Sequence, residues 1–157
     1  MMGAARSTLT LSIAQLEDRN TILGWANDPQ VRRASFQTGE ISEHEHVIWF
    51  AAILRDPDSQ IWILKKNGVS CGMVRAERLD GIATLSYSVA ASHRGKGISI
   101  PMLKLALEEM GKIWPNGKVV AWTRSDNIAS IRALEKVHFQ RDNIEKERVR
   151  FVITLNG

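Results

Sequence analysis

Residues that carry redox or metal chemistry are scarce in this sequence. Cys71 is the only cysteine among the 157 residues, so an intrachain disulfide and a zinc site of several thiolates are both excluded. We expect Cys71 to be a small core residue of a strand. Two of the four histidines, His44 and His46, lie two residues apart near the start of a predicted helix, where they cannot share one face. The sequence therefore predicts no metal site.

Long apolar runs and basic tracts are missing as well. No segment approaches the roughly 18 apolar residues that a bilayer-spanning helix needs, and Met1–Arg6 lacks the apolar stretch of a secretory signal. We therefore expect a cytoplasmic protein with no membrane partner. The net charge is +4, but the 21 lysines and arginines are dispersed along the chain, so we expect no nucleic-acid partner. A small polyanionic ligand would be attracted by the same charge.

The composition is that of an ordinary globular protein, with 44% hydrophobic and 24% charged residues. A chain of 157 residues is long enough to bury a sizeable core without disulfides or metals, and short for two domains. It contains no internal repeat, low-complexity tract or linker. The sequence predicts a single domain over residues 1–157.

Hydrophobic periodicity and turn residues predict an alternation of strands and helices. Strands are expected at residues 9–13, 60–65, 69–78, 83–89 and 118–124, then at Phe139 and at 149–155. Helices are expected at 17–26, 42–55, 98–110 and 127–137, with a loop or short helix at 31–36. Asn67-Gly68 predicts a hairpin turn, and Ser42 with Glu45 predicts a capping box. Ser125 or Asp126 is expected to cap the last helix.

The central feature of the sequence is a strand that runs into a glycine-spaced basic turn and then into a helix. Residues 83–89 alternate apolar and polar side chains, whereas Ile98 begins an apolar stripe with helical spacing. The Arg-Gly-Lys-Gly segment at 94–97 lies between them. Glycines allow the backbone to approach a ligand closely, and the first N–H groups of a helix have no intrahelical partner. The turn therefore predicts a phosphate-binding site.

Two motifs, in this order, resemble the GNAT superfamily of acyl-CoA-dependent N-acyltransferases. The first runs from Arg94 through Gly97 to Ser99 and is similar to the family's pattern of arginine or glutamine, two residues, glycine, one residue, glycine or alanine, with Ser99 at the last position. The second motif comprises Asn127, Ser130, Glu135-Lys136 and Phe139. The resemblance covers nearly the whole chain. It implies an α/β GNAT fold, with a mixed central sheet of about six to seven strands flanked by about four helices.

The resemblance implies acetyl-CoA as the cofactor. The backbone N–H groups from Arg94 to Ser99 would hold its pyrophosphate at a helix N-terminus, where the helix dipole favours an anion. The strand that ends at Val89 would diverge from its neighbour and offer backbone groups to the pantetheine arm. The cofactor-binding residues implied are Val89, Arg94, Gly95, Lys96, Gly97, Ile98, Ser99, Asn127 and Ser130.

The resemblance also implies direct attack of an amine on the thioester, with no covalent enzyme intermediate. The amine loses a proton to a base or a water chain, and an acid helps the thiolate to leave. Many members place a tyrosine seven residues after the asparagine as this acid, but here that residue is Leu134 and the only tyrosine is Tyr87. We therefore expect coenzyme A to leave as a thiolate that water or another group protonates.

Several residues are candidates for the base: Glu77, Ser86, Ser88, His44 and His46. His46 is favoured of the two histidines because it accompanies Trp49 and Phe50. The residues assigned to catalysis are Glu77, His46, Tyr87 and Ser88. His138 stands where the family has a glycine, and we expect it to be structural, in a left-handed conformation after a helix.

A second resemblance concerns the acceptor. The segment from Trp25 to Arg32, with Phe36, His46 and Trp49, is similar to the sugar-nucleotide N-acetyltransferases of pseudaminic acid biosynthesis. Those enzymes acetylate the 4-amino group of a UDP-linked dideoxy amino sugar, so a UDP-amino sugar is the expected small-molecule partner. The substrate-binding residues are then Arg32, Arg33, Arg75 and Arg78 for the diphosphate, and Phe36 and Trp49 for the uracil or the sugar.

Two other functions stay open on the sequence. One is a protein or ribosomal N-terminal acetyltransferase, which would need a peptide groove between the first two helices and the last strands. The other is an acetyl-CoA-binding module without catalysis, in keeping with Leu134. A homodimer is compatible with the sequence, which does not determine the oligomeric state.

Overall fold

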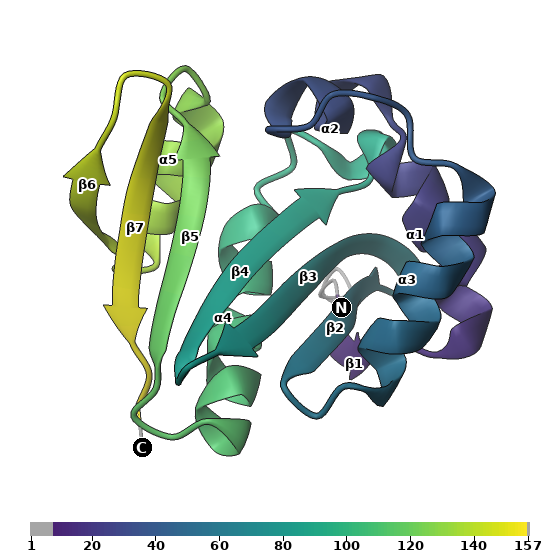
Figure 1. Ribbon diagram of the computed structural model, residues 1–157, viewed down its shortest axis with the longest axis horizontal. Coiled ribbons are helices and arrows are strands. Elements are labelled where there is room, and N and C mark those ends of the chain that lie inside the picture. Colours follow the sequence, from purple (N-terminus) through teal and green to yellow (C-terminus); the bar gives the residue numbers. More distant parts are fainter. Residues whose placement is uncertain (1–7, 157) are drawn as a thin grey trace, which may run out of the picture.

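The computed structural model describes residues 8–156, so the expectation about Met1–Arg6 lies outside the described residues. This part of the chain forms one mixed sheet of seven strands in the order β1-β2-β3-β4-β5-β7-β6 (Figure 1). The strands β4 and β5 are parallel, and all other neighbours are antiparallel. The strands are β1 (Leu9–Ile13), β2 (Ser59–Lys66), β3 (Val69–Leu79), β4 (Ile82–Val89), β5 (Lys118–Arg124), β6 (Gln140–Ile144) and β7 (Arg148–Thr154).

Five α-helices within residues 8–156 flank this sheet, one more than expected. The helices are α1 (Arg19–Ala26), α2 (Pro29–Ala34), α3 (Glu43–Arg55), α4 (Ser99–Ile113) and α5 (Ile128–Lys136), with short 3₁₀ turns at Leu16–Asp18 and Ala91–His93. The additional helix is α2, where the sequence left a loop or a short helix open. Pro29 takes its first position, and the Asp28 carboxylate accepts a hydrogen bond from the Gln30 N–H at 2.9 Å.

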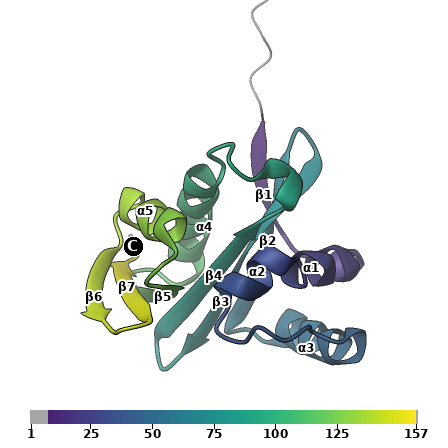
Figure 2. The same cartoon turned by 90° about the horizontal axis from the view of Figure 1, so that it is seen from above.

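The helices cover the sheet unevenly. Figure 2 shows α4 and α5 on one face, and α1, α2 and α3 on the other, over β2 to β4. The face of β5, β7 and β6 opposite α5 carries no helix of residues 8–156 in that view. Among the same residues, no helix is both long and apolar enough to cross a membrane.

Two apolar cores in the described part of the chain hold these layers together. The larger core lies between the sheet and α4 and α5, and it contains Met102, Leu103 and Met110 on the predicted apolar stripe of α4. The smaller core joins α1 and α3 to the other face and includes Ile22 and Phe50. Burial of each such side chain contributes about 1.5–3 kcal/mol, so the two cores decide which helix lies on which face.

The β4 and β5 strands diverge at their carboxyl ends. They pair only between Ile82–Leu85 and Lys118–Ala121, whereas the β3–β4 ladder continues to Val89. The ends of the two strands therefore open into the V visible in Figure 1, as expected from the family resemblance. Backbone groups of residues 86–89 on this side have no partner among the described strands and are available to a ligand.

Several local expectations are confirmed. Asn67 and Gly68 have positive φ angles of 51° and 83°, as in the hairpin turn that their sequence predicts. His138 follows α5 with φ of 77°, in the left-handed conformation expected of it. The cap of α5 is different, because Asn127 and not Ser125 or Asp126 accepts a hydrogen bond from the Ser130 N–H, at 3.2 Å.

The β6 strand begins directly after Phe139, where the sequence indicated a strand but not its extent. All five of its residues are exposed, and it pairs only with β7 at the edge of the described sheet. A strand that is exposed on both faces has no apolar alternation, so periodicity contains no signal for it. Charged and polar residues of this kind are typical of edge strands.

Candidate active site

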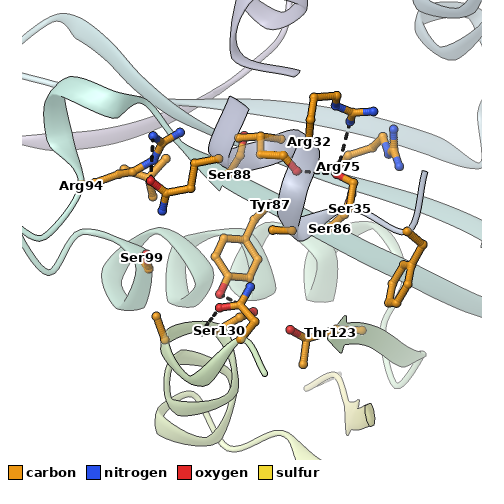
Figure 3. A pocket seen from close by; sticks show the side chains of 18 of the residues that line it. Arg32, Ser35, Arg75, Ser86, Tyr87, Ser88, Arg94, Ser99, Thr123 and Ser130 are labelled. Atoms are coloured by element: carbon orange, nitrogen blue, oxygen red, sulfur yellow. Dashed lines mark hydrogen bonds between the residues drawn. The ribbon is translucent and has the colours of Figure 1, made fainter. Parts of the chain in front are cut away.

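A solvent-open cleft of ≈ 800 Å³ occupies the V between β4 and β5. One wall consists of β4, the 94–99 turn and the start of α4, and the opposite wall consists of β5 and one side of α5. The α2 helix and the α2–α3 loop (residues 35–41) close it from the third side. The cleft therefore brings together segments from both halves of the chain (Figure 3).

The glycine-spaced turn lies at one end of the cleft, as predicted. Val89, Arg94, Gly95, Gly97, Ile98 and Ser99 all line it. Gly95 and Gly97 have φ angles of 75° and 71°, which turn the backbone sharply into α4. Within residues 8–156, the first turn of α4 has no side-chain cap, unlike the first turns of α2, α3 and α5. Its backbone N–H groups are thus available to bind an anion.

Lys96 is placed differently from the prediction. It stands exposed at the tip of the turn and does not line the cleft. The reason is the alternation of the turn, in which Gly95 and Gly97 face the cleft and the residue between them faces solvent. The charge of Lys96 adds to the local electrostatic field, but its side chain does not take part in the cleft lining at the predicted phosphate-binding turn.

The Arg94 side chain extends from the turn toward α2. Its guanidinium donates to Asp28 Oδ1 at 3.0 Å and to Gln30 Oε1 at 3.3 Å. Burial opposes the ionisation of Asp28, but the hydrogen bonds from Arg94 and the Gln30 N–H outweigh it and leave the pKa of Asp28 below its ordinary value. The two side chains form an ion pair that is largely shielded from solvent, with 24% and 22% of their surfaces exposed.

Tyr87 of β4 and the N-terminal part of α5 meet inside the cleft. The hydroxyl of Tyr87 and Ser130 Oγ are 2.9 Å apart in a hydrogen bond (Figure 3). Burial raises the pKa of the Tyr87 hydroxyl, against the opposing effect of the Ser130 hydrogen bond. Asn127 lines the cleft next to them, and so does Leu134, which is only 1% exposed. The predicted residues Tyr87, Asn127 and Ser130 are therefore brought together around the apolar side chain that replaces the usual tyrosine.

The wall formed by β4 also carries polar side chains, together with a residue of the neighbouring strand β3. Ser86 and Ser88 of β4 line it beside Arg75 of β3, because alternate residues of a strand share a face. The Arg75 guanidinium lies 5.2 Å from the centroid of the Trp49 ring and 3.6 Å from a Glu77 carboxylate oxygen. Arg75, which the sequence predicted to bind the substrate diphosphate, thus reaches the cleft. Its ion pair with Glu77 is long and weak.

Arg32 lines the cleft, but its guanidinium is already occupied. It donates to the carbonyl oxygens of Ala26, Gln37 and Gly39 at 2.6, 3.0 and 3.3 Å, and to Ser35 Oγ at 3.3 Å. These bonds tie the α2–α3 loop to the end of α1. Arg32 therefore has a structural role here, and because its guanidinium already has these partners, its binding of the substrate diphosphate stays a prediction.

Two predicted catalytic residues lie outside the cleft. His46 is 3% exposed, packed against Trp49 and Phe50, and its Nε2 lies 2.9 Å from the Arg19 carbonyl oxygen. Burial lowers the pKa of His46, against the opposing effect of this hydrogen bond. Glu77 lies on β3 opposite Thr84, on the same face as Arg75 but farther along the strand, and it is not among the residues that line the cleft. Neither residue is among those that line the cleft, and their catalytic roles stay predictions.

Three predicted substrate-binding residues are also outside the cleft lining. Trp49 lies beneath Arg75, and Arg33 is on α2. Arg78 is near the end of β3, where it pairs with Asp58 at 2.7 Å and stacks over Trp114. Phe36, in contrast, does line the cleft, at 5.6 Å from the Arg124 guanidinium. Residue type alone does not distinguish the residues that line the cleft from those outside it, because the direction of each side chain depends on how α3 and β3 pack.

Glu40 and Glu45 line the cleft, although sequence reasoning did not assign them to a site. Ser42 Oγ caps α3 by accepting from the Glu45 N–H at 3.1 Å, as half of the predicted capping box. Among the described residues, no hydrogen bond joins the Glu45 carboxylate back to Ser42, and neither glutamate forms an ion pair. Both carboxylates are therefore available on the acceptor side of the cleft.

Comparison with known proteins agrees with this geometry. The model of a family described as the acetyltransferase (GNAT) domain matches residues 8–140. None of the curated protein sequences compared with the chain matches it. The solved structure of spermidine N-acetyltransferase from Vibrio cholerae, in complex with CoA and spermine, is 17% identical, with a TM-score of 0.86 over 94% of this chain and 95% of that chain.

Two further solved structures have the same fold. An N-acetyltransferase from Staphylococcus aureus Mu50 is 23% identical, with a TM-score of 0.82 over 96% of this chain and 100% of that chain. The aminoglycoside acetyltransferase AAC(6')-Ib, in complex with coenzyme A, is 18% identical, with a TM-score of 0.79 over 94% of this chain and 95% of that chain. At these identities the likeness concerns the fold.

Proposed function

Because the chain belongs to the GNAT acetyltransferase domain family, we propose that it transfers the acetyl group of acetyl-CoA to a primary amine of a small molecule. The observation that carries this proposal is the divergence of β4 and β5 directly beside an uncapped, glycine-spaced helix start. The gap between the diverging strands suits an extended acyl-pantetheine arm, and the uncapped helix start suits a diphosphate. The CoA-bound neighbours support acetyl-CoA as the cosubstrate.

The residues of the cleft suit the binding of acetyl-CoA. Backbone N–H groups from Gly95 to Ser99 would receive the pyrophosphate, and the unpaired edge of residues 86–89 would bind the pantetheine amides. Bound acetyl-CoA supplies the thioester that the amine attacks. Leu134 and the ring of Tyr87 provide an apolar surface beside Ser130 on the α5 side.

Deprotonation of the amine falls to groups on the acceptor side. The hydroxyls of Ser86 and Ser88 can orient water, and Glu45 is a carboxylate of the cleft that can accept the proton through that water. Glu45 takes this role in the proposal in place of His46 and Glu77, which lie outside the cleft lining. As the C–N bond forms and the C–S bond breaks, the proton goes to the base and the electron pair to the thiolate.

A nucleotide-linked amino sugar is the acceptor that we place first. Arg75 offers a guanidinium to a phosphate, and Phe36 and Trp122 offer aromatic surface from opposite walls of the cleft. Fewer arginines support this acceptor than the sequence implied. Arg33 and Arg78 lie outside the cleft lining, and the guanidinium of Arg32 already donates to carbonyl oxygens.

A cationic amine is the second candidate acceptor, and Glu40 and Glu45 favour it. Two carboxylates on one wall attract ammonium groups, and they also suit the base that acetyl transfer needs. Neighbouring structures include a spermidine acetyltransferase with spermine and an aminoglycoside acetyltransferase. A peptide N-terminus fits less well, because Arg124 donates to the Ser35 carbonyl oxygen and bridges the route between the helices and β5.

A thiol-release assay with acetyl-CoA and a panel of amines tests the function. The panel contains UDP-amino sugars, polyamines, aminoglycosides and peptides with free N-termini, each assayed with Arg75→Gln and Glu45→Gln. For a nucleotide-linked sugar we expect Arg75→Gln to raise KM by about tenfold or more, as loss of a charged hydrogen bond predicts. For a polyamine, Glu45→Gln should lower kcat/KM by a similar factor, and Arg75→Gln should not.

Charged residues away from the cleft supply matched controls for this panel. Arg132→Gln on α5 and Glu108→Gln on α4 remove the same charges, and both should match the wild type. Turnover of peptides alone would overturn the small-molecule proposal in favour of an N-terminal acetyltransferase. Acetyl-CoA binding without thiol release for any amine would identify a binding module without catalysis.

A further inference from the structure

The α2 helix is attached at both ends to the half of the molecule that carries the cofactor site. Its N-cap, Asp28, pairs with Arg94 of the glycine-spaced turn, and its C-cap, Ser35, accepts two hydrogen bonds from Arg124 of β5. The helix itself comes from the other half of the chain, between α1 and α3. Arg94 therefore contacts this short helix from the β4 side of the V, and Arg124 contacts it from the β5 side.

The attachment at Arg94 uses both ends of the guanidinium. One terminal nitrogen donates to Asp28 Oδ1 at 3.0 Å and the other to Gln30 Oε1 at 3.3 Å. Asp28 Oδ1 also accepts the Gln30 N–H at 2.9 Å, so the same carboxylate caps α2 and binds the arginine. If the Arg94 side chain turned away to bind a phosphate, the Asp28 carboxylate, which is 22% exposed, would lose the cation with which it pairs.

The attachment at Arg124 closes the other end of the helix. Its Nε and terminal nitrogen donate to the Ser35 carbonyl oxygen at 3.2 and 2.7 Å, and its guanidinium stacks on Phe36. A carbonyl oxygen after a helix has no intrahelical donor, so a charged donor there is favourable. Ser35 and Phe36 both line the cleft, and Arg124 thereby sets the position of this part of the lining.

We propose that Arg94 and Arg124 are positioning residues that hold α2 in place as the acceptor wall, and that the Arg94 side chain belongs to this support and not to the pyrophosphate site. The backbone N–H groups of the turn remain the phosphate donors. The inference rests on the proposed function in one respect, namely that the amine enters beside α2. The lowered pKa of Asp28 is in keeping with a persistent ion pair.

The proposal gives the backbone and the Arg94 side chain of this turn different roles in the reaction. The backbone of residues 95–99 binds the cofactor, and the side chain of Arg94 positions Gln30, Val31 and Ala34, which α2 contributes to the cleft. Loosening α2 would widen the acceptor side without changing the cofactor side. The specificity for the amine therefore depends on residues that do not touch it.

Hydrogen exchange of the α2 amides and calorimetric binding of acetyl-CoA test this inference together. The variants are Asp28→Asn, Arg94→Gln, their combination and Arg124→Gln. Asp28→Asn is informative because asparagine still caps a helix, so only the charge is lost. We expect the three single variants to speed exchange in α2 by roughly tenfold, the double variant to add little to either parent, and acetyl-CoA affinity to stay within about twofold in all of them.

The Arg132→Gln variant, on α5 and outside the cleft lining, is the control for removal of one positive charge, and its α2 exchange should equal that of the wild type. Unchanged α2 exchange in Asp28→Asn and Arg94→Gln would overturn the inference. So would a loss of acetyl-CoA affinity of about tenfold in Arg94→Gln with none in Asp28→Asn, because Arg94 would then bind the pyrophosphate. A wild type that binds no acetyl-CoA would refute the proposed function, whereas the exchange comparison in the free protein would still test the attachment.

Discussion

The single tyrosine of the chain occupies the wall of the cleft where an acid for the leaving thiolate would be expected. The Tyr87 hydroxyl forms a hydrogen bond of 2.9 Å with Ser130 of α5. Burial raises the pKa of the Tyr87 hydroxyl, so it stays protonated. A thiol with an ordinary pKa near 8.5 leaves readily as a thiolate at neutral pH. Protonation by a side chain is then a small part of the barrier.

We therefore predict that Tyr87→Phe keeps most of its kcat, with a decrease below about tenfold, whereas a general acid contributes roughly 10²–10⁴-fold. Thiol release under saturating acetyl-CoA is the measurement. Ser130→Ala breaks the same hydrogen bond from α5 and serves as the comparison, so its kcat should be similar. A loss of about 100-fold in the Phe variant alone would assign Tyr87 the role of the acid.

The buried position of His46 outside the cleft lining leads us to expect a contribution to stability. Burial lowers its pKa, so the folded state favours the neutral ring that contacts the Arg19 carbonyl oxygen. The unfolded chain binds a proton near the ordinary histidine pKa of about 6.5, and the folded chain binds it only at lower pH. The contribution of His46 to stability is therefore complete above about pH 6.5 and decreases as the pH falls toward the folded pKa.

Urea unfolding at about pH 7.5 and about pH 5.5 measures this dependence. We predict that His46→Gln loses less of its stability between these two values than the wild type does. His44→Gln is the matched control, because His44 is exposed two residues earlier on α3, and its pH dependence should equal that of the wild type. Parallel curves for the His46 variant and the wild type would contradict the assignment.

At the scale of single elements, the start of α4 is the part on which we expect acetyl-CoA binding to depend. Gly97 has φ of 71°, where a β-branched residue costs about 1–3 kcal/mol, although a Cβ there would meet no atom within 4 Å. We predict that Gly97→Val shifts the turn and abolishes acetyl-CoA binding while the fold is retained. Calorimetry measures the affinity, and circular dichroism measures the fold.

Gly24→Ala in α1 is the control for this prediction. Gly24 lies in a helix without a positive φ and does not line the cleft, and a methyl group added there would meet no atom within 4 Å. Alanine there should preserve acetyl-CoA affinity and favour the helix by about 0.5–1 kcal/mol. Unchanged acetyl-CoA affinity in Gly97→Val would refute the phosphate-binding role of the turn.

The elements that were predicted well are those whose signals are local. The stripe of α4, the Asn67-Gly68 hairpin and the strand pattern of β4 depend on neighbours within a few residues, and their positions agree with the structure. The elements whose type or extent stayed open, α2 and β6, are short and polar and lack periodicity. They form because Arg94 and β7 supply partners from elsewhere in the chain.

At the scale of the whole molecule, the cleft exists because two halves of one sheet separate. The half from β1 to β4 carries α1, α2 and α3, and the half from β5 to β7 carries α5. The larger core nevertheless continues from Trp62 of β2 to Phe151 of β7 beneath the V. We infer that residues 8–156 form a single domain, in which a shared core holds the walls of the cleft at a constant distance.

Local signals in the sequence were enough to predict the family, the glycine-spaced turn and the order of most elements, because glycine spacing, capping residues and periodicity act over a few residues. Which side chains face the acceptor depends on the tertiary structure. Asp28 and Arg94 are 66 residues apart, and Ser35 and Arg124 are 89 residues apart. Contacts at such separations depend on how helices pack on a twisted sheet, which also turns His46 inward and places Glu45 in the cleft.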